Sequence, residues 1–193
     1  MGKLPKLLRS AKNKNLLVAG CGTGSEISSF VQGKDEWKIT GVDPTPEMIS
    51  EARLKFQNTK NVKLIESTVS NIGMADKFGA STPLLVLHFM DDDGTKYELL
   101  KSIADKLESH TPFFILDIMN NKEQMKSDLN ILRQLLPDGL KKEDIDHQLD
   151  KIDDQLDVIS EERLIELLIE SGYDRPIRFY QNSIYMGWMT KKL

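Results

Sequence analysis

An apolar run that ends in closely spaced glycines, residues 16–25, constrains the fold of this chain more than any other feature. Its first four residues have the length and composition of a buried strand, and Gly20, Gly22 and Gly24 follow at alternate positions. Glycine permits tight backbone turns and lets a ligand approach the main chain. Because a helical pattern begins directly after the last glycine, the run predicts a strand, a glycine-rich turn and a helix.

Short apolar runs and helical patterns then alternate as far as Asp117. We expect strands over residues 16–19, 37–42, 62–65, 84–87 and 113–116, and helices over 24–31, 46–56 and 97–107. The run over 84–87 is continuously apolar, which is typical of strands that are covered on both faces. Strands that alternate with helices form a parallel sheet with right-handed crossovers, so we expect an α/β fold with helices on both faces of the sheet.

The alternation breaks after the fifth expected strand. Residues 121–157 have a mostly helical and polar pattern, which predicts a helical insertion. One apolar stripe at helical spacing runs through it, formed by Ile145, Leu149, Ile152 and Leu156. A lid over the site is one alternative for the role of this insertion.

The last forty residues or so restore the sheet pattern. A helix is expected over 161–170, with Ser160 as its N-cap and Gly172 as its stop. Two further strands, 177–181 and 184–189, are separated by a connection short enough for an antiparallel hairpin. The expected sheet therefore has seven strands, mostly parallel, and ends in an antiparallel hairpin.

Composition excludes several classes of protein. A length of 193 residues predicts a single domain over residues 1–193. A net charge of −4 disfavours a generic nucleic-acid binder, and a single cysteine permits neither an intrachain disulfide nor a cysteine-based zinc site. The chain shows neither a membrane-spanning apolar run nor a secretory signal pattern. We therefore expect a cytoplasmic protein with no bound metal and no membrane partner.

An acid at the end of the second expected strand adds to the glycine loop. Asp43 lies 19 residues beyond Gly24, and an acid there can accept hydrogen bonds from both ribose hydroxyls of a nucleoside. Taken singly, the glycines are compatible with a plain tight turn, and Asp43 is compatible with a turn before Pro44. Together, at two strand ends, they predict a nucleoside cofactor.

These motifs resemble those of the class I S-adenosylmethionine-dependent methyltransferases. The family's glycine loop, V-x-G-C-G-T-G, is matched by residues 18–24, and its motif G-V-D-x-S/T-x-x-M is matched by 41–48. Its fourth-strand motif is matched by 84–89, and the family's C-terminal pattern by 170–173 and the hairpin. The resemblance implies a Rossmann-like fold and methyl transfer from S-adenosylmethionine, with S-adenosylhomocysteine as product.

The resemblance also implies a role for each matched position. At the methionine end of the cofactor, the implied contacts are Gly20, Gly22 and Gly24, and the cavity near the sulfonium is lined by Leu87, His88 and Phe89. At the ribose, the implied contact is Asp43. At the adenine, Met48 lies against the ring, and Thr68 and Val69 meet its edge. Ala19, Cys21 and Pro44 complete the implied cofactor-binding set. Many relatives place an aspartate after the third strand, where this chain has Thr68, so a hydroxyl or backbone contact to the adenine is expected.

Two side chains are candidates for catalysis. His88 follows the apolar run 84–87, and the ordinary pKa of histidine, about 6.5, suits a base or an acceptor-orienting group. Asp117 ends the fifth expected strand, where it can face the acceptor. The alternatives are that His88 packs or hydrogen-bonds within the protein and that Asp117 is a turn residue. The acids at 91–93 are interpreted as the entry of the next helix.

Within the family, the resemblance is closest to the branch that contains carboxy-S-adenosylmethionine synthase, an enzyme of tRNA wobble-uridine modification. That enzyme uses an arginine beyond the fifth strand to hold the extra carboxylate of its cofactor. Here residues 138–157 contain lysines and no arginine, and Arg133 lies earlier in the insertion. Because arginine and lysine are not interchangeable at a bidentate carboxylate site, we expect an ordinary methyl donor.

The acceptor is expected to be a small molecule. Residues 138–157 carry eight acids and three lysines, which would repel a phosphate backbone, so nucleic acid is disfavoured, whereas a cationic acceptor would be attracted. Three alternatives are left for the acceptor side: it is open, it is closed by the insertion, or it is closed by a partner subunit, which would make the protein a homodimer. A tRNA-modifying enzyme and a cofactor-binding protein without turnover are the alternatives.

Overall fold

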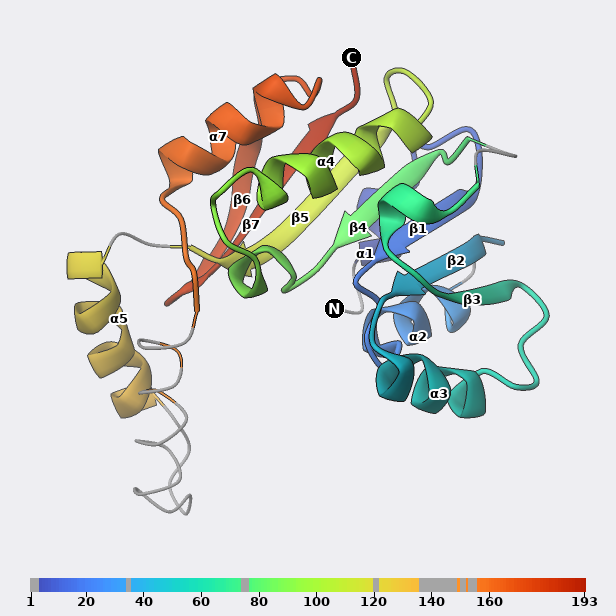
Figure 1. Ribbon diagram of the computed structural model, residues 1–193, viewed down its shortest axis with the longest axis horizontal. Coiled ribbons are helices and arrows are strands. Elements are labelled where there is room, and N and C mark those ends of the chain that lie inside the picture. The colour runs from blue at the N-terminus through green and yellow to red at the C-terminus, as the bar shows by residue number, and fades with distance from the viewer. Residues whose placement is uncertain are drawn as a thin grey trace.

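A seven-stranded sheet forms the centre of the computed structural model, which describes residues 4–33, 36–73, 77–119, 122–135, 149, 152 and 156–193. The strand order is β3-β2-β1-β4-β5-β7-β6 (Figure 1). The strands are β1 (Asn15–Ala19), β2 (Lys38–Asp43), β3 (Val62–Glu66), β4 (Ala80–Pro83), β5 (Pro112–Ile118), β6 (Ile177–Asn182) and β7 (Tyr185–Lys191).

The pairing of these strands is mixed. β1 to β5 pair in parallel, whereas β7 runs antiparallel to both β5 and β6. Sequence order reverses across the β1–β4 boundary, because β2 and β3 lie on one side of β1 while β4 and β5 lie on the other. The predicted α/β class, the seven strands and the C-terminal antiparallel hairpin are confirmed.

Helices cover both faces of the sheet. The described helices are α1 (Leu4–Leu7), α2 (Ser25–Val31), α3 (Pro46–Lys55), α4 (Thr95–Lys106), α5 (Lys122–Leu135) and α7 (Glu161–Glu170), with short 3₁₀ turns η1 (Val69–Asn71) and η2 (Leu87–Phe89), and all of these helices except α5 pack on the sheet. α4 and α7 lie side by side on the near face in Figure 1, and α5 stands away from the sheet.

β1 shows why the sheet is covered twice. Its alternate side chains enter two separate cores: Leu17 and Ala19 pack with α4 and α7, whereas Leu16 and Val18 pack with α1, α2 and α3. All four side chains are fully buried. Successive side chains of a strand point to opposite faces of the sheet. A strand that is buried on both faces therefore needs apolar residues at every position.

Local sequence signals set the helix boundaries. Pro46 is the first residue of α3, where a missing N–H costs little. The Ser160 hydroxyl accepts a hydrogen bond from the Arg163 N–H at 3.2 Å and caps α7 as predicted. Gly172 has a φ of 92°, so it ends that helix in the left-handed conformation that the sequence predicted for a stop.

The fourth strand was predicted at the wrong residues. β4 is Ala80–Pro83, and the apolar run 84–87 leaves the sheet instead of forming a strand. Leu84 makes one bridge to Leu116, Leu85 then adopts a φ of 60°, and the chain turns into η2. The strand was missed because two of its four residues are polar, although Ser81 and Thr82 are fully buried.

Those buried hydroxyls are satisfied by hydrogen bonds. Ser81 Oγ donates to the Leu17 carbonyl at 2.9 Å, and Thr82 Oγ1 donates to Glu26 Oε1 at 2.5 Å. Buried polar groups are tolerated when they are paired, so apolarity alone was a poor guide to this strand.

The predicted insertion is described in part. α5 follows β5, and Leu149, Ile152 and Leu156 of the predicted stripe pack with Met125 and Leu129 of α5 in a third, smaller core. Ile145 and most of the acidic stretch over 138–157 lie outside the described residues. The role of the insertion as a lid stays a prediction.

We expect Leu17→Ala to lower the free energy of unfolding by about 2–5 kcal/mol, because it leaves a cavity in a fully buried strand. Leu54→Ala on α3 is the matched control: its side chain is 68% exposed, so a change within about 0.5 kcal/mol is expected. Urea denaturation of both variants measures the difference, and equal losses would contradict the central position of β1.

Candidate active site

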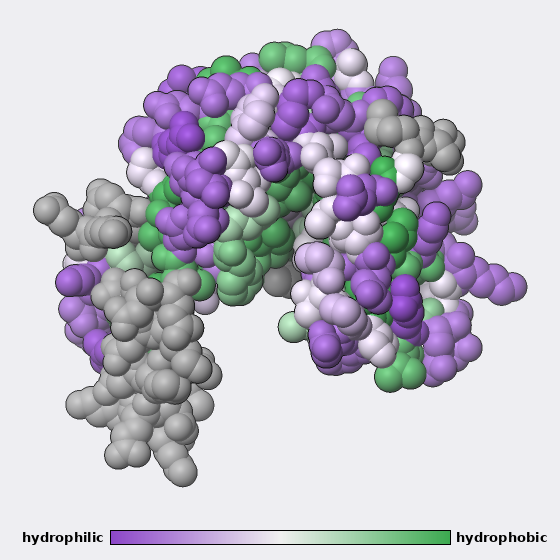
Figure 2. Space-filling model, in the orientation of Figure 1, coloured by the Kyte–Doolittle hydropathy of each residue, from purple (hydrophilic) through white to green (hydrophobic). Residues whose placement is uncertain are grey.

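A cavity of about 610 Å³ opens at the carboxyl ends of the parallel strands, where the strand order reverses between β1 and β4. Four segments line it: the glycine loop after β1, the end of β2 with the start of α3, the loop after β3, and the loop after β4. In Figure 2 a notch in the molecular surface lies beside a hydrophobic wall. Crevices at such a switch point are where open α/β sheets bind ligands.

The glycine loop is held in a conformation that favours glycine. Gly20, Gly22 and Gly24 have φ values of 68°, 50° and 78°. A Cβ on Gly20 would lie 2.5 Å from Val86 Cγ2, and one on Gly24 would lie 2.4 Å from Phe56 Cε2. A Cβ on Gly22 would meet no atom within 4 Å, so the backbone there borders open space that a ligand can fill.

Asp43 ties the glycine loop to α3. Its Oδ2 accepts the Gly22 N–H at 2.9 Å, and its Oδ1 accepts the Thr45 N–H at 2.9 Å. The side chain is buried and lines the cavity. Each carboxylate oxygen can accept a second hydrogen bond, so the pair fits two adjacent hydroxyls, as a ribose would present them.

The predicted adenine side is apolar with a hydroxyl at its edge. Pro44, Met48, Thr68 and Val69 line this part of the cavity. Thr68 Oγ1 lies 2.9 Å from Ser70 Oγ, and Ser67 adds a second hydroxyl to the lining from the same loop. The arrangement is compatible with the expected hydroxyl or backbone contact to an adenine.

The structure brings most of the predicted cofactor-binding residues together around this cavity. Those that line it are Gly20, Cys21, Gly22, Asp43, Pro44, Met48, Thr68, Val69 and Phe89. Those that do not are Ala19, Gly24, Leu87 and His88, and Asp117, which was predicted only as a catalytic residue, does not line it either. Ala19 and Leu87 are fully buried in the core shared with α4 and α7, so their side chains support the site from behind.

The two predicted catalytic residues are bonded to one another. His88 Nδ1 lies 2.5 Å from Asp117 Oδ1, and both side chains are buried. The Asp117 carboxylate also accepts the N–H groups of Val86 at 2.9 Å, Leu87 at 2.7 Å and Ile118 at 2.8 Å. This carboxylate therefore organises the loop after β4, while catalysis by either residue stays a prediction.

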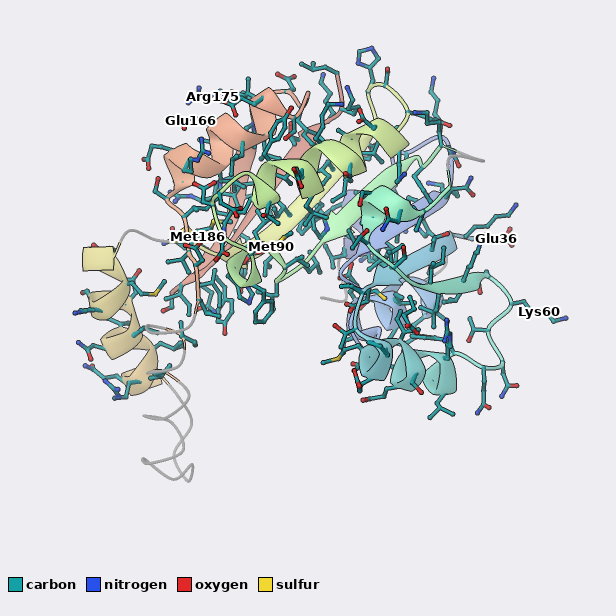
Figure 3. All side chains as sticks on the ribbon, viewed as in Figure 1. Glu36, Lys60, Met90, Glu166, Arg175 and Met186 are labelled. Carbon is teal, nitrogen blue, oxygen red and sulfur yellow. The ribbon has the colours of Figure 1, made fainter. Side chains whose placement is uncertain are left out.

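That loop presents an aromatic ring at the mouth of the cavity. The Phe89 ring lies 4.1 Å from the His88 ring between centroids, and the Phe89 side chain is 75% exposed. Leu85 and Met90 line the cavity beside it, and Figure 3 labels Met90 next to η2. A solvent-exposed apolar surface of this kind beside a cavity suits an apolar part of a ligand.

Sequence reasoning missed Glu26, which also lines the cavity. It lies on α2, is 5% exposed, and burial raises the pKa of its carboxyl to about 8. A signal was present, because Glu26 is one helical turn from the buried Phe30 and so shares its face. Burial, with the charges of Asp43 and Glu26, raises the pKa of the Cys21 thiol to about 12, which makes a thiolate nucleophile untenable.

The chain that returns from the insertion is fastened to the loop after β4. Lys96 is fully buried and donates hydrogen bonds to the carbonyls of Met90 and Asp157. The Asp157 N–H donates to the His88 carbonyl at 3.0 Å. The Asp93 carboxylate accepts the Thr95 N–H at 3.0 Å at the start of α4, in keeping with the helix-entry interpretation of the acids at 91–93.

No group of three histidine, cysteine, aspartate or glutamate side chains in the described ranges is placed to hold a metal ion. Among the helices that the structure describes, none is both long enough and apolar enough to cross a membrane.

Comparison with known proteins agrees with the geometry of the site. Residues 16–110 match the profile of a family described as a methyltransferase domain. The chain is 27% identical over 96 residues to malonyl-[acyl-carrier protein] O-methyltransferase 1 of Ilyobacter polytropus, a match that covers 50% of this chain and 36% of that protein. The chain thus spans about a third of the length of this curated relative.

Solved structures share the whole fold at low sequence identity. Human N-acetylserotonin methyltransferase, in complex with S-adenosylmethionine, superposes with a TM-score of 0.67 at 17% identity, over 93% of this chain and 47% of that one. Magnesium protoporphyrin IX methyltransferase from Synechocystis, with bound S-adenosylhomocysteine, gives 0.67 at 14% identity, over 100% and 80% of the two chains. A Burkholderia thailandensis 1,6-didemethyltoxoflavin N1-methyltransferase gives 0.65 at 17%, over 99% and 78%.

The solved structures show which fold this chain has. The chain has the Rossmann-like fold of the class I S-adenosylmethionine-dependent methyltransferases. The residues that match the methyltransferase-domain profile, 16–110, carry the glycine loop and Asp43.

We expect Asp117→Asn to lower the free energy of unfolding by about 2–3 kcal/mol, because an amide cannot accept all the hydrogen bonds that this buried carboxylate accepts. Asp105→Asn is the control, since its side chain is 52% exposed and little change is expected. Urea denaturation checks both variants. Equal stability of the two would contradict the organising role of Asp117.

The raised pKa of the Glu26 carboxyl predicts that the free energy of unfolding depends on pH. Its folded-state pKa of about 8 lies above the ordinary value of 4.5, so the folded protein binds this proton more tightly than the unfolded chain does. Its contribution is therefore lost as pH rises from about 4.5 to about 8. Glu26→Gln removes the titration, so the variant should gain stability over wild type across that window. Thermal unfolding across the window measures the gain, and a pH-independent difference would contradict the burial of a titrating acid.

Proposed function

We propose that the protein transfers the methyl group of S-adenosylmethionine to a small-molecule acceptor. The observation that carries the proposal is one cavity that contains both a nucleoside-type site, made by the glycine loop and Asp43, and an apolar mouth at Leu85, Phe89 and Met90. S-adenosylmethionine, when bound, supplies a methyl group already activated on a sulfonium.

The residues present fit this cofactor. Asp43 offers two carboxylate oxygens to the ribose hydroxyls, and Gly22 leaves open space beside the backbone. Met48 and Val69 offer apolar surface to the faces of the adenine, with the Thr68 hydroxyl at its edge. The chain's own task is then to hold the acceptor in line with the bond that breaks and to exclude water.

The acceptor would lie against the loop after β4. Phe89, Leu85 and Met90 form its apolar contact surface, and Asp117 with His88 fixes the loop that carries them. In this proposal His88 and Asp117 act as positioning residues. A role for His88 as the base toward a protonated acceptor would require it to reach the cavity, which it does not line in this structure.

The names of similar proteins support a small acceptor. The solved structures include methyltransferases whose names specify N-acetylserotonin, magnesium protoporphyrin IX and 1,6-didemethyltoxoflavin. The cytoplasmic location and a homodimer stay predictions.

An ordinary methyl donor fits better than a carboxylated one. The lining residues that the structure describes include the acids Glu26 and Asp43 and neither lysine nor arginine. The carboxylated cofactor would bring one more negative charge than S-adenosylmethionine to these acids, and the described lining supplies no cation to pair with it. Arg133, the remaining candidate from the sequence, lies on α5, donates to Asn130 Oδ1 at 2.9 Å, and does not line the cavity.

Calorimetry tests the proposal. We expect S-adenosylmethionine and S-adenosylhomocysteine to bind, and Asp43→Ala to weaken both by about 100-fold, since two hydrogen bonds to a charged group are lost. NAD and carboxy-S-adenosylmethionine should bind far more weakly. Asp105→Ala, at an exposed position outside the cavity, is the matched control and should bind as wild type does.

Other outcomes of the titration decide between the alternatives. Preference for the carboxylated cofactor would favour the tRNA-modifying branch, and binding of NAD alone would overturn the proposal. Mass spectrometry of a small-molecule acceptor screen follows. Binding without methylation of any acceptor would indicate a cofactor-binding protein without turnover.

A further inference from the structure

The cavity contains a buried carboxyl without a counter-charge. Glu26 is 5% exposed, and Thr82 Oγ1 is its one hydrogen-bond donor among the described residues, at 2.5 Å from Oε1. Within the described ranges, no lysine, arginine or histidine forms an ion pair with it. Burying an acid in this way is costly unless the acid is protonated or a cation is supplied.

Glu26 and Asp43 lie at different parts of the glycine loop. Asp43 ends β2 and already accepts two backbone N–H groups. Glu26 lies on α2 and reaches Thr82 of β4, which is the register partner of Val18 in β1. One carboxyl is therefore associated with the β2 side of β1 and the other with the β4 side, and both line the same cavity.

The cofactor has a matching distribution of charge. The methionyl tail ends in an ammonium and a carboxylate. If Asp43 holds the ribose, a tail that follows the glycine loop would lead toward the β4 side of the cavity. The described lining offers the ammonium two carboxyls, of which Asp43 is engaged at the ribose. We infer that Glu26 is the residue that receives the ammonium group of the cofactor's methionyl tail, and that it gives up its proton to solvent on doing so. This inference rests on the proposed function.

The proton balance follows from the surroundings of Glu26. In the free protein burial raises the pKa of the carboxyl to about 8, so it is mostly neutral at pH 7. The groups shown to interact with it are the hydroxyl of Thr82 and the neutral thiol of Cys21. The Asp43 carboxylate lines the same cavity, and on the glycine loop the Lys55 Nζ donates to the Gly24 carbonyl at 3.4 Å. An arriving ammonium stabilises the carboxylate, so the O–H bond breaks, the proton leaves to buffer, and the ammonium keeps its own protons.

A comparison of two ligands distinguishes the contact with Glu26 from the contacts with the rest of the site. S-adenosylhomocysteine has the amino-acid tail, whereas 5′-methylthioadenosine has the same adenosine and thioether without it. We expect Glu26→Gln to weaken binding of the first by about tenfold to a hundredfold, since a charged hydrogen bond is lost, and to leave binding of the second unchanged. Gln keeps an oxygen for the Thr82 hydroxyl, so unchanged 5′-methylthioadenosine affinity also reports an intact fold.

Proton release gives a second readout. Calorimetry at pH 7 in two buffers of different ionisation enthalpy should show that wild type releases a large fraction of a proton on binding S-adenosylhomocysteine, and that Glu26→Gln releases almost none. Wild-type affinity should rise between about pH 6 and about pH 8. Glu47→Gln, an exposed acid on α3 outside the cavity lining, is the matched control and should behave as wild type.

The failures are distinguishable. If wild type binds neither ligand, the proposed function fails. If wild type and Glu26→Gln bind S-adenosylhomocysteine equally, with equal proton release, the cofactor site stands and the assignment of Glu26 is overturned.

Discussion

Burial of β1 on both faces is the constraint on which the rest of this structure depends. Its side chains pack alternately into two cores, so the strand must run through the middle of the sheet. β2 and β4 take its two sides, and their connections leave in opposite directions across the sheet. The carboxyl end of β1 therefore faces a place that neither crossover covers, and the glycine loop lies there.

Three buried carboxyl groups near the cavity differ in the number of hydrogen-bond donors that the protein supplies to each, and their roles differ accordingly. Asp117 has three backbone N–H groups and the imidazole of His88, so it is satisfied without a ligand and fixes the loop after β4. Asp43 has two backbone donors and capacity to spare. Glu26 has one hydroxyl and a pKa raised by burial to about 8. The fewer donors the protein supplies, the more a ligand can contribute.

The sequence predicted the elements in which the residue type alone indicates burial or a helix end. Strands β1 and β5 have apolar runs, β2 and β3 have apolar residues between polar ones, and Pro46, Ser160 and Gly172 mark helix ends by their own local chemistry. β4 was misplaced because its buried Ser81 and Thr82 are paired with groups distant in the sequence. The apolar run after it belongs to a loop whose backbone is satisfied by Asp117, about thirty residues away along the chain.

The same division applies to the site. The amino-acid sequence by itself determined the sheet class, the glycine loop and the acid at the end of β2, because strand burial, turn chemistry and strand-end position are local properties. Only the tertiary structure decided that His88 and Asp117 are turned toward one another, and that Glu26 shares a cavity with Asp43. The burial of a side chain and its hydrogen-bond partners depend on which distant segments come into contact in the fold. A single sequence contains little information about such tertiary contacts.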